Sequence, residues 1–233
     1  MIVEFVGIPG CGKSTIARAM EMVCADSGET VTMYQNPLKR NLFFKICQSA
    51  YIVMVSLFER KTRSILSKIA KIQIHLLWEN GIKAYKSMPF LFKILLIFRY
   101  CGGLKEDNII IIEQGVFQYL SSALFKMRYA KKIIKDFVSE NMLTSENWHV
   151  VFCDIEIDEC MNRLKNRKNG LSRIEKYPQS QWEQELRDQM IRYEDIKRIC
   201  LFMFEKNVCL STTNVSPDEN ALIICKRIGI ICE

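Results

Sequence analysis

Residues 7–14 read GIPGCGKS and satisfy the pattern G-x-x-x-x-G-K-[ST] at every fixed position. A short apolar run precedes them and a helical pattern follows, so the glycines fall at a predicted strand-to-helix turn. Glycines allow the backbone to curl so that its N–H groups point at phosphate oxygens, and the following helix adds the positive end of its dipole. The pattern therefore predicts a phosphate-binding loop at the start of an α/β fold.

Two side chains of this P-loop (Walker A) motif have distinct expected roles. Lys13 is expected to reach the terminal phosphates of a bound nucleotide, and Ser14 to offer its hydroxyl to Mg²⁺. ATP and Mg²⁺ are accordingly the predicted cofactors. The residues of the loop that we expect to hold the nucleotide are Gly7, Pro9, Gly10, Cys11, Gly12, Lys13, Ser14 and Thr15.

Strand and helix patterns alternate along the rest of the chain, which favours a parallel sheet covered on both faces. We therefore predict a three-layer P-loop NTPase fold with a five-stranded parallel sheet, as one domain over residues 1–233. Residues 38–103 are almost free of strand patterning and are predicted to form a helical insertion between the second and third strands. The insertion is expected to cover an acceptor pocket or to form a homodimer face. The predicted strands are 2–6, 31–34, 108–112, 148–153 and 208–211, and the longer predicted helices are 39–58, 61–85, 89–100, 116–138, 158–168 and 181–206.

Polar residues follow the predicted strands, where an open parallel sheet collects its ligand-binding side chains. Glu113 comes directly after a buried strand and is expected to hold Mg²⁺ together with Ser14, or to accept a proton from the attacking hydroxyl. A solvated acid at a strand end is the alternative. Asn36, Glu113 and Gln114 are the predicted acceptor-binding residues, although an ordinary Asn-Pro turn also explains Asn36.

Three arginines follow the fourth predicted strand. Arg163, Arg167 and Arg173 are expected to neutralise charge that spreads over the transferring phosphoryl group. With Lys13 and Glu113 they make up the predicted catalytic set. The alternative is that these are surface arginines that pair with Glu159 or Glu175.

Charge and composition narrow the function classes. The net charge of +7 is spread along the sequence, which suits an anionic small molecule, and no nucleic-acid recognition motif is present. Only two histidines occur, so a histidine-based metal site is not expected. None of the ten cysteines has C-x-x-C spacing, which favours reduced, buried thiols over a disulfide set.

No membrane-spanning segment is expected, although two apolar stretches, 46–58 and 90–100, invite the question. Both are shorter than the ~20 residues that a spanning helix needs, and a buried helix or an interface explains them better than peripheral membrane contact. The chain opens directly on a strand, which leaves no room for a signal peptide. We therefore expect a cytoplasmic protein.

With these residues assembled, the chain resembles the thymidylate-kinase-like group of P-loop nucleoside and nucleotide kinases. The resemblance implies that Arg163 faces the nucleotide, that residues 163–175 form an arginine-bearing lid, and that the turn after the last strand lies beside the adenine. It thereby puts Asn214 and Val215 among the nucleotide-binding residues. The segments that carry it are 7–15, 153–164, 167–175 and 216–219.

Two departures from the pattern of this family bear on the acceptor. The acid of the third strand is followed by Gln114, where the family usually has an arginine that grips the acceptor's phosphate. The second strand is followed by residues 35–38, QNPL, in place of a glycine-rich segment. The sequence thus predicts an ATP-dependent kinase whose acceptor is a nucleotide, a nucleoside or a sugar or other alcohol. A nucleotide-dependent switch or regulatory ATPase that acts on a protein partner is the alternative, and the absence of an N-K-x-D motif leaves ATP and GTP both open.

Overall fold

The computed structural model describes residues 1–34, 50, 54, 59–102, 108–124, 130–139, 147–167, 172, 174–203, 207–213 and 215–231, and the account below refers to these. The predicted helix 39–58 falls almost entirely outside them. So do three predicted site residues, which are Asn36, Arg173 and Asn214.

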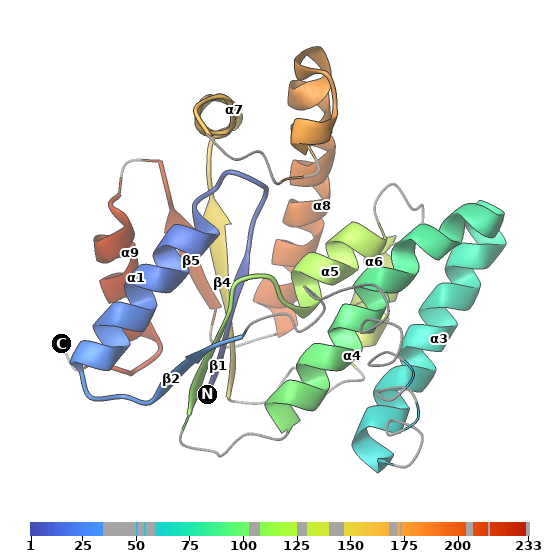
Figure 1. Ribbon diagram of the computed structural model, residues 1–233, viewed down its shortest axis with the longest axis horizontal. Helices are drawn as coiled ribbons and strands as arrows, with labels where there is room; N and C mark the ends of the chain where they lie inside the picture. The colour runs from blue at the N-terminus through green and yellow to red at the C-terminus, as the bar shows by residue number, and fades with distance from the viewer. Residues whose placement is uncertain are drawn as a thin grey trace.

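A five-stranded sheet forms the middle layer, and every neighbouring pair of its strands is parallel (Figure 1). Its strand order is β2-β3-β1-β4-β5. All four isoleucines of β3 are buried, as expected for a central strand that is covered on both faces. The predicted five-stranded parallel sheet is thereby confirmed. The strands are β1 (Ile2–Val6), β2 (Val31–Met33), β3 (Ile109–Ile112), β4 (Trp148–Asp154) and β5 (Asn207–Ser211).

Helices cover both faces of the sheet and make the fold three-layered (Figure 1). On one face, α1 (Lys13–Asp26) packs against α9 (Pro217–Arg227). Ser216 caps α9, since its hydroxyl accepts the N–H of Glu219 while the Glu219 carboxylate accepts the N–H of Ser216. The other face carries α5 (Val116–Ala123), α6 (Ala130–Ser139) and α8 (Trp182–Met203), while α7 (Ile157–Lys165) and the short 3-10 helices Ile174–Lys176 and Gln179–Gln181 follow β4.

The insertion between β2 and β3 is helical where the structure describes it. It consists of α3 (Arg60–Asn80), a 3-10 helix η2 (Gly81–Ser87) and α4 (Met88–Gly102). Figure 1 shows α3 at the outer edge of the molecule, and α4 lies between it and α5. The insertion therefore adds one helical layer beside α5, close to the carboxyl end of β3.

Two predicted helix boundaries were wrong. The helix predicted to reach residue 85 ends at Asn80, because Gly81 adopts a φ of 54° and the chain continues as η2. The next helix, predicted from residue 89, begins one residue earlier at Met88, so that Pro89 lies in its first turn, where its missing N–H removes no helical hydrogen bond. The stretch 116–138 contains two described helices, because α5 ends at Ala123 and α6 begins at Ala130.

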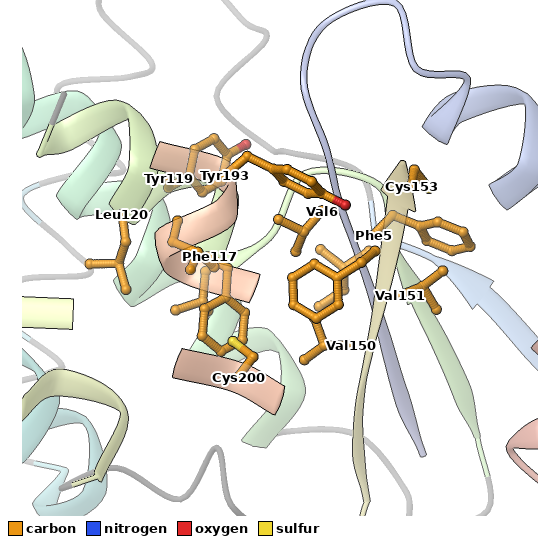
Figure 2. Close-up of a cluster of buried hydrophobic side chains, with 14 of the residues drawn as sticks. Phe5, Val6, Phe117, Tyr119, Leu120, Val150, Val151, Cys153, Tyr193 and Cys200 are labelled. Carbon is orange, nitrogen blue, oxygen red and sulfur yellow. The ribbon is translucent and has the colours of Figure 1, made fainter. Parts of the chain in front are cut away.

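Large side chains fill the space between the sheet and the helices α5 and α8 (Figure 2). Phe117 of α5 and Phe152 of β4 are fully buried there, and Val6 of β1 lies on the same face of the sheet as Phe152. Apolar side chains of this size each bury enough surface to contribute about 2–3 kcal/mol. The cluster thus fixes the loop after β1 and the turn between β3 and α5 relative to each other. Within the described residues, no helix is long and apolar enough to cross a membrane.

Candidate functional site

The carboxyl ends of four strands converge on one edge of the sheet. The P-loop follows β1, Glu113 follows β3, and α7 follows β4, while the loop after β5 begins at Thr212. Because all strands are parallel, these segments meet at the same edge. The structure therefore brings the P-loop, Glu113 and the α7 arginine together, as the sequence predicts.

The backbone of the P-loop is held open by its glycines. Gly10 and Gly12 have φ angles of 89° and 93°, a region that other residues seldom adopt. A Cβ on Gly7 would lie 2.5 Å from Cys11 Sγ and 3.1 Å from the Cys153 carbonyl oxygen. Close packing thus requires glycine at position 7, and the positive φ requires glycine at position 12.

Lys13, the first residue of α1, is folded back over the loop. Its ammonium donates to the carbonyl oxygens of Gly7 at 2.7 Å and Ile8 at 3.0 Å, and it lies 3.4 Å from Cys11 Sγ. The pKa of the Cys11 thiol is lowered, chiefly by a hydrogen bond from the Cys153 thiol and also by the charge of Lys13, although burial opposes the shift. The ammonium group of Lys13 thus adds a positive charge to the P-loop.

Ser14 and Glu113 meet across the site. Ser14 Oγ donates a hydrogen bond to Glu113 Oε1, which joins the start of α1 to the end of β3. A hydroxyl and a carboxylate beside a phosphate loop supply the hard oxygen ligands that Mg²⁺ prefers. The two side chains therefore fit a partly hydrated Mg²⁺ ion. No cluster of three or more His, Cys, Asp or Glu suited to a metal occurs among the described residues.

A buried carboxyl group lies beneath the turn that carries Glu113. Glu4 of β1 is fully buried, and its Oε1 accepts the backbone N–H of Phe117 at 2.7 Å, at the first turn of α5. A Cβ on Gly115 would overlap this carboxyl group. Burial raises the pKa of Glu4 to about 8, although the N–H groups of Phe117, Val116 and Gln118 act in the opposite direction. Glu4 therefore supports the turn between β3 and α5 in its neutral form at pH 7.

The raised pKa of Glu4 predicts a specific pH dependence of stability. From its ordinary value of 4.5 up to about 8, the unfolded chain ionises Glu4 while the folded chain keeps the proton, so stability falls as pH rises. Between pH 5.5 and 7.5 the wild type should lose roughly 2–3 kcal/mol relative to Glu4→Gln. Urea unfolding of both proteins at the two pH values checks this. An unchanged difference between them would show that Glu4 is ionised in the fold.

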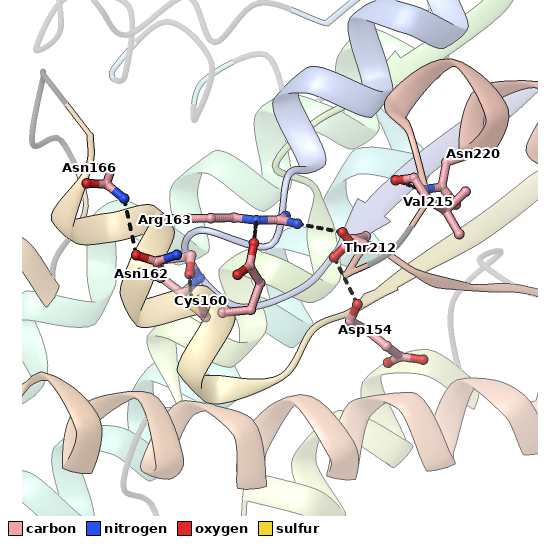
Figure 3. A network of polar contacts seen from close by, with 10 residues as sticks. Asp154, Cys160, Asn162, Arg163, Asn166, Thr212, Val215 and Asn220 are labelled. Carbon is pink, nitrogen blue, oxygen red and sulfur yellow. Dashed lines mark hydrogen bonds and ion pairs between the residues drawn. The ribbon is translucent and has the colours of Figure 1, made fainter.

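Arg163 of α7 lies beside the P-loop and is held from two sides. Its Nε donates to Glu159 Oε1 at 2.7 Å, and its Nη2 donates to the Thr212 carbonyl oxygen at 2.6 Å (Figure 3). A Cβ on Gly12 would lie 3.6 Å from Arg163 Nη1, which places the guanidinium next to the loop. The alternative pairing with Glu159 is therefore found, and the guanidinium also lies beside the P-loop.

Arg167 lies beyond α7, because this helix ends at Lys165 and not at residue 168 as predicted. The chain leaves the helix through Asn166, which is its C-cap. Arg167 still lines the site, and its Nη1 is 3.8 Å from Glu175 Oε2. The alternative of a pair with Glu175 is thus found together with a place at the cavity.

A polar cluster behind the site ties β4, β5 and α8 together. Asp154, at the end of β4, accepts from Tyr193 at 2.6 Å and from Lys197 at 2.6 and 2.7 Å. Its carbonyl oxygen accepts the N–H and hydroxyl of Thr212, each at 2.9 Å (Figure 3). Burial and the neighbouring Asp154 raise the pKa of Tyr193. The cluster fixes the loop after β5 relative to α8.

A single cavity of about 870 Å³ joins these groups. It runs from the loop after β5, across the P-loop, to a wall formed by α4 and α5. Apart from Gly7, whose carbonyl receives Lys13, all of the described residues that we predicted for the site line it. They are Pro9, Gly10, Cys11, Gly12, Lys13, Ser14, Thr15, Glu113, Gln114, Arg163, Arg167 and Val215.

Sequence reasoning missed most of the cavity wall opposite the P-loop. Ser121 and Ser122 follow Gln118 at three- and four-residue spacing, which is a signal that points to one helix face. Phe90 and Lys93 of α4 and Gln189 of α8 had no such signal, because they are distant in sequence from every motif. Lys93 Nζ lies 4.9 Å from the centre of the Tyr119 ring. The other missed lining residues include Tyr119, Thr212, Pro217 and Asn220.

No protein-family model matches the chain, and no curated protein matches it either. Its structure is similar to that of a deoxyadenosine kinase from M. mycoides with bound dATP, with 17% identity over 97% of this chain and 98% of the other and a TM-score of 0.51. It is also similar to the YorR protein from Bacillus subtilis in complex with phosphorylated GDP (14% identity, 99% and 96% coverage, TM-score 0.50). A shikimate kinase from Bacteroides thetaiotaomicron gives 9% identity, 98% coverage of both chains and a TM-score of 0.50. These similarities confirm the predicted fold class, a P-loop α/β fold with helices on both faces of the sheet.

Proposed function

We propose that this chain is an ATP- and Mg²⁺-dependent phosphotransferase that moves the γ-phosphoryl group to a small-molecule acceptor. One observation carries the proposal. The same cavity contains the P-loop, the Ser14–Glu113 pair and a further wall of aromatic, amide and hydroxyl side chains. A volume of about 870 Å³ is within the range of small-molecule sites. The cavity thus has room for a nucleotide phosphate tail and for a second reactant.

The nucleotide would enter from the side of β5. Val215, Pro217 and Asn220 line that end of the cavity, and Arg163 joins it to the P-loop through Thr212. In this arrangement the base would lie beside Val215, and the phosphates would meet the N–H groups at the start of α1. Asn214, which lies outside the described residues, stays a proposed nucleotide-binding residue. The first turn of α1 contains no acidic residue, so nothing in it opposes the attraction of an anion.

Transfer of the phosphoryl group relies on positioning and charge. Lys13 would exchange its carbonyl partners for the terminal phosphate oxygens, and Arg163, Arg167 and Arg173 would offset the charge that spreads over the group in the transition state. Ser14 and Glu113 would hold Mg²⁺, which supplies further charge neutralisation at the phosphates. If the hydroxyl of the acceptor approaches Glu113, this carboxylate can also accept its proton.

The acceptor would occupy the wall between α4 and α5. Phe90 and Tyr119 supply aromatic side chains there, with Gln114 and Gln118 as hydrogen-bonding groups. Asn36, which lies outside the described residues, stays a proposed acceptor-binding residue. Such a chemically mixed cavity wall fits a small molecule better than a protein partner. This observation favours a kinase over the alternative of a regulatory ATPase.

The structural neighbours support the kinase class, because a deoxyadenosine kinase and a shikimate kinase share this fold. Membership of the thymidylate-kinase-like group remains our proposal and rests on the motif residues. We also propose a single kinase domain over residues 1–233 with the insertion 38–103, a lid over residues 163–175, a homodimer and a cytoplasmic location. The cysteines that the structure describes are free thiols, which suits that compartment.

ADP release tests the proposed function directly. We expect release from Mg·ATP to depend on one class among nucleosides, nucleoside monophosphates, sugars and other alcohols, because the second wall must be filled for transfer. Coupled-enzyme assays over this panel, with a thermal-shift titration of Mg·ATP, measure both steps. Slow release that ignores every acceptor would instead indicate the regulatory ATPase. Absence of any nucleotide affinity would refute both functions.

A further inference from the structure

The 3-10 helix η2, between α3 and α4, presents three chemically different rows. A 3-10 helix has three residues per turn, so every third side chain lies on the same row. Ala84 and Ser87 form the inner row, because Ala84 is buried and Ser87 donates to the Ala123 carbonyl oxygen at 3.0 Å. This row fixes η2 against the end of α5.

The second row is apolar and faces away from the protein. Ile82 is 85% exposed, Tyr85 is 61% exposed, and Met88, the next residue on this row, is 53% exposed. Lys83 and Lys86 form the third row, and both are exposed. An apolar row beside a lysine row on one short helix is the pattern of a segment that lies at a membrane surface.

The end of α3 continues this pattern. Trp78 is 90% exposed, and Ile74 and Leu77 of the neighbouring turn are 63% and 47% exposed. The inner face of α3 is different, since Ile72 and Leu76 are buried. A helix in a soluble protein ordinarily buries its large apolar side chains, so a second, outward apolar stripe requires a reason of its own.

The positive charge of the insertion indicates what kind of partner binds this apolar surface. Glu79 is the sole acid in the sequence from residue 60 to residue 102, while Lys71, Lys83 and Lys86 accompany the exposed apolar residues. A two-fold contact between copies would set each lysine-bearing surface against itself, which is unfavourable. Anionic phospholipids complement both features, because their headgroups attract lysine and their boundary region accepts tryptophan and isoleucine.

We propose that residues 74–88, at the end of α3 and along η2, dock the protein onto an anionic phospholipid surface. Trp78 and Ile82 enter the headgroup region, while Lys83 and Lys86 contact lipid phosphates. Figure 1 shows α3 at the edge of the molecule. The described residues that line the catalytic cavity include none from 74–88, so docking leaves that cavity accessible. The protein would thus meet its acceptor at or near a membrane.

Vesicle co-sedimentation of the full chain tests this proposal. Binding to vesicles of phosphatidylcholine with phosphatidylglycerol should be at least about tenfold tighter than to phosphatidylcholine alone, and it should weaken with salt. Tryptophan emission should shift to the blue on binding, since Trp78 moves out of water. The double variant Trp78→Ser/Ile82→Ser should bind about tenfold more weakly or worse, and Lys83→Gln/Lys86→Gln should lose the preference for anionic vesicles.

Phe202→Ser is the matched control, because Phe202 of α8 is 85% exposed but lies outside the proposed surface. It should bind vesicles as the wild type does. Equal binding to both kinds of vesicle, or none, would overturn the proposal. So would a dimer in sedimentation velocity that Trp78→Ser/Ile82→Ser converts to a monomer, since the surface would then join two copies. ADP release in solution is measured separately, so these outcomes leave the proposed kinase activity unaffected.

Discussion

Replacing Lys13 with alanine is expected to lower acceptor-dependent ADP release by about 10² or more. The Lys13 ammonium is bound to two carbonyl oxygens of the loop, at 2.7 and 3.0 Å, so its charge is already placed at the proposed phosphate site. Alanine leaves the backbone N–H groups and the α1 dipole in place but removes that charge. Turnover should therefore fall much more than the affinity for nucleotide, which a comparison of kcat with thermal-shift titration would reveal.

A lysine outside the site separates this effect from a general loss of charge. Lys226 lies in the last turn of α9, is exposed, and is at the end of that helix opposite the cavity-lining Pro217. Lys226→Ala should retain wild-type turnover. Because Lys13 also satisfies carbonyl groups of the loop, the melting temperature of Lys13→Ala must be compared with that of the wild type. A well-folded Lys13→Ala protein with activity within a few-fold of the wild type would remove Lys13 from the mechanism.

The phosphate loop and the sheet could be predicted because their signals are local. Gly10 and Gly12 are needed where φ is positive, and the isoleucines of β3 form an unbroken apolar run that only a buried strand explains. Helix ends in the insertion were harder to predict. Gly81 marks the end of α3, but the 3-10 helix that follows depends on how Ala84 and Ser87 pack on neighbouring helices, and such contacts leave no periodic pattern in sequence.

The cavity wall formed by α4 and α5 and the support beneath the site depend on tertiary contacts. Lys93 comes within 4.9 Å of the Tyr119 ring only because α4 packs on α5. Glu4 interrupts the apolar run of β1 and in sequence resembles a solvent-facing position. Its burial under Gly115 becomes evident only when β1 and β3 are neighbours, as the register of Glu4 with Ile112 shows. Contacts between residues that are distant in sequence are what the motifs alone do not encode.

Glu113→Gln should lower turnover by about 10² or more, because Glu113 combines two proposed roles at the end of β3. Its carboxylate accepts the Ser14 hydroxyl and so belongs to the proposed Mg²⁺ site, and it faces the cavity that would hold the acceptor. Glutamine preserves the shape but loses the charge and the ability to take a proton. Steady-state assays over a wide range of Mg²⁺ concentration distinguish the roles. Recovery of activity at high Mg²⁺ indicates a metal role, whereas a loss that persists at saturation indicates proton transfer.

Glu29→Gln provides the matched control for Glu113. Glu29 is exposed and precedes β2, at the amino-end edge of the sheet, so its loss changes the net charge equally without reaching the cavity. Its activity and Mg²⁺ requirement should match the wild type. If Glu113→Gln behaved in the same way at every Mg²⁺ concentration, the carboxylate at the end of β3 would be a solvated strand-end acid. The hydrogen bond between Ser14 and Glu113 would then only stabilise the fold. The metal would have to be bound by the nucleotide and by Ser14, without Glu113.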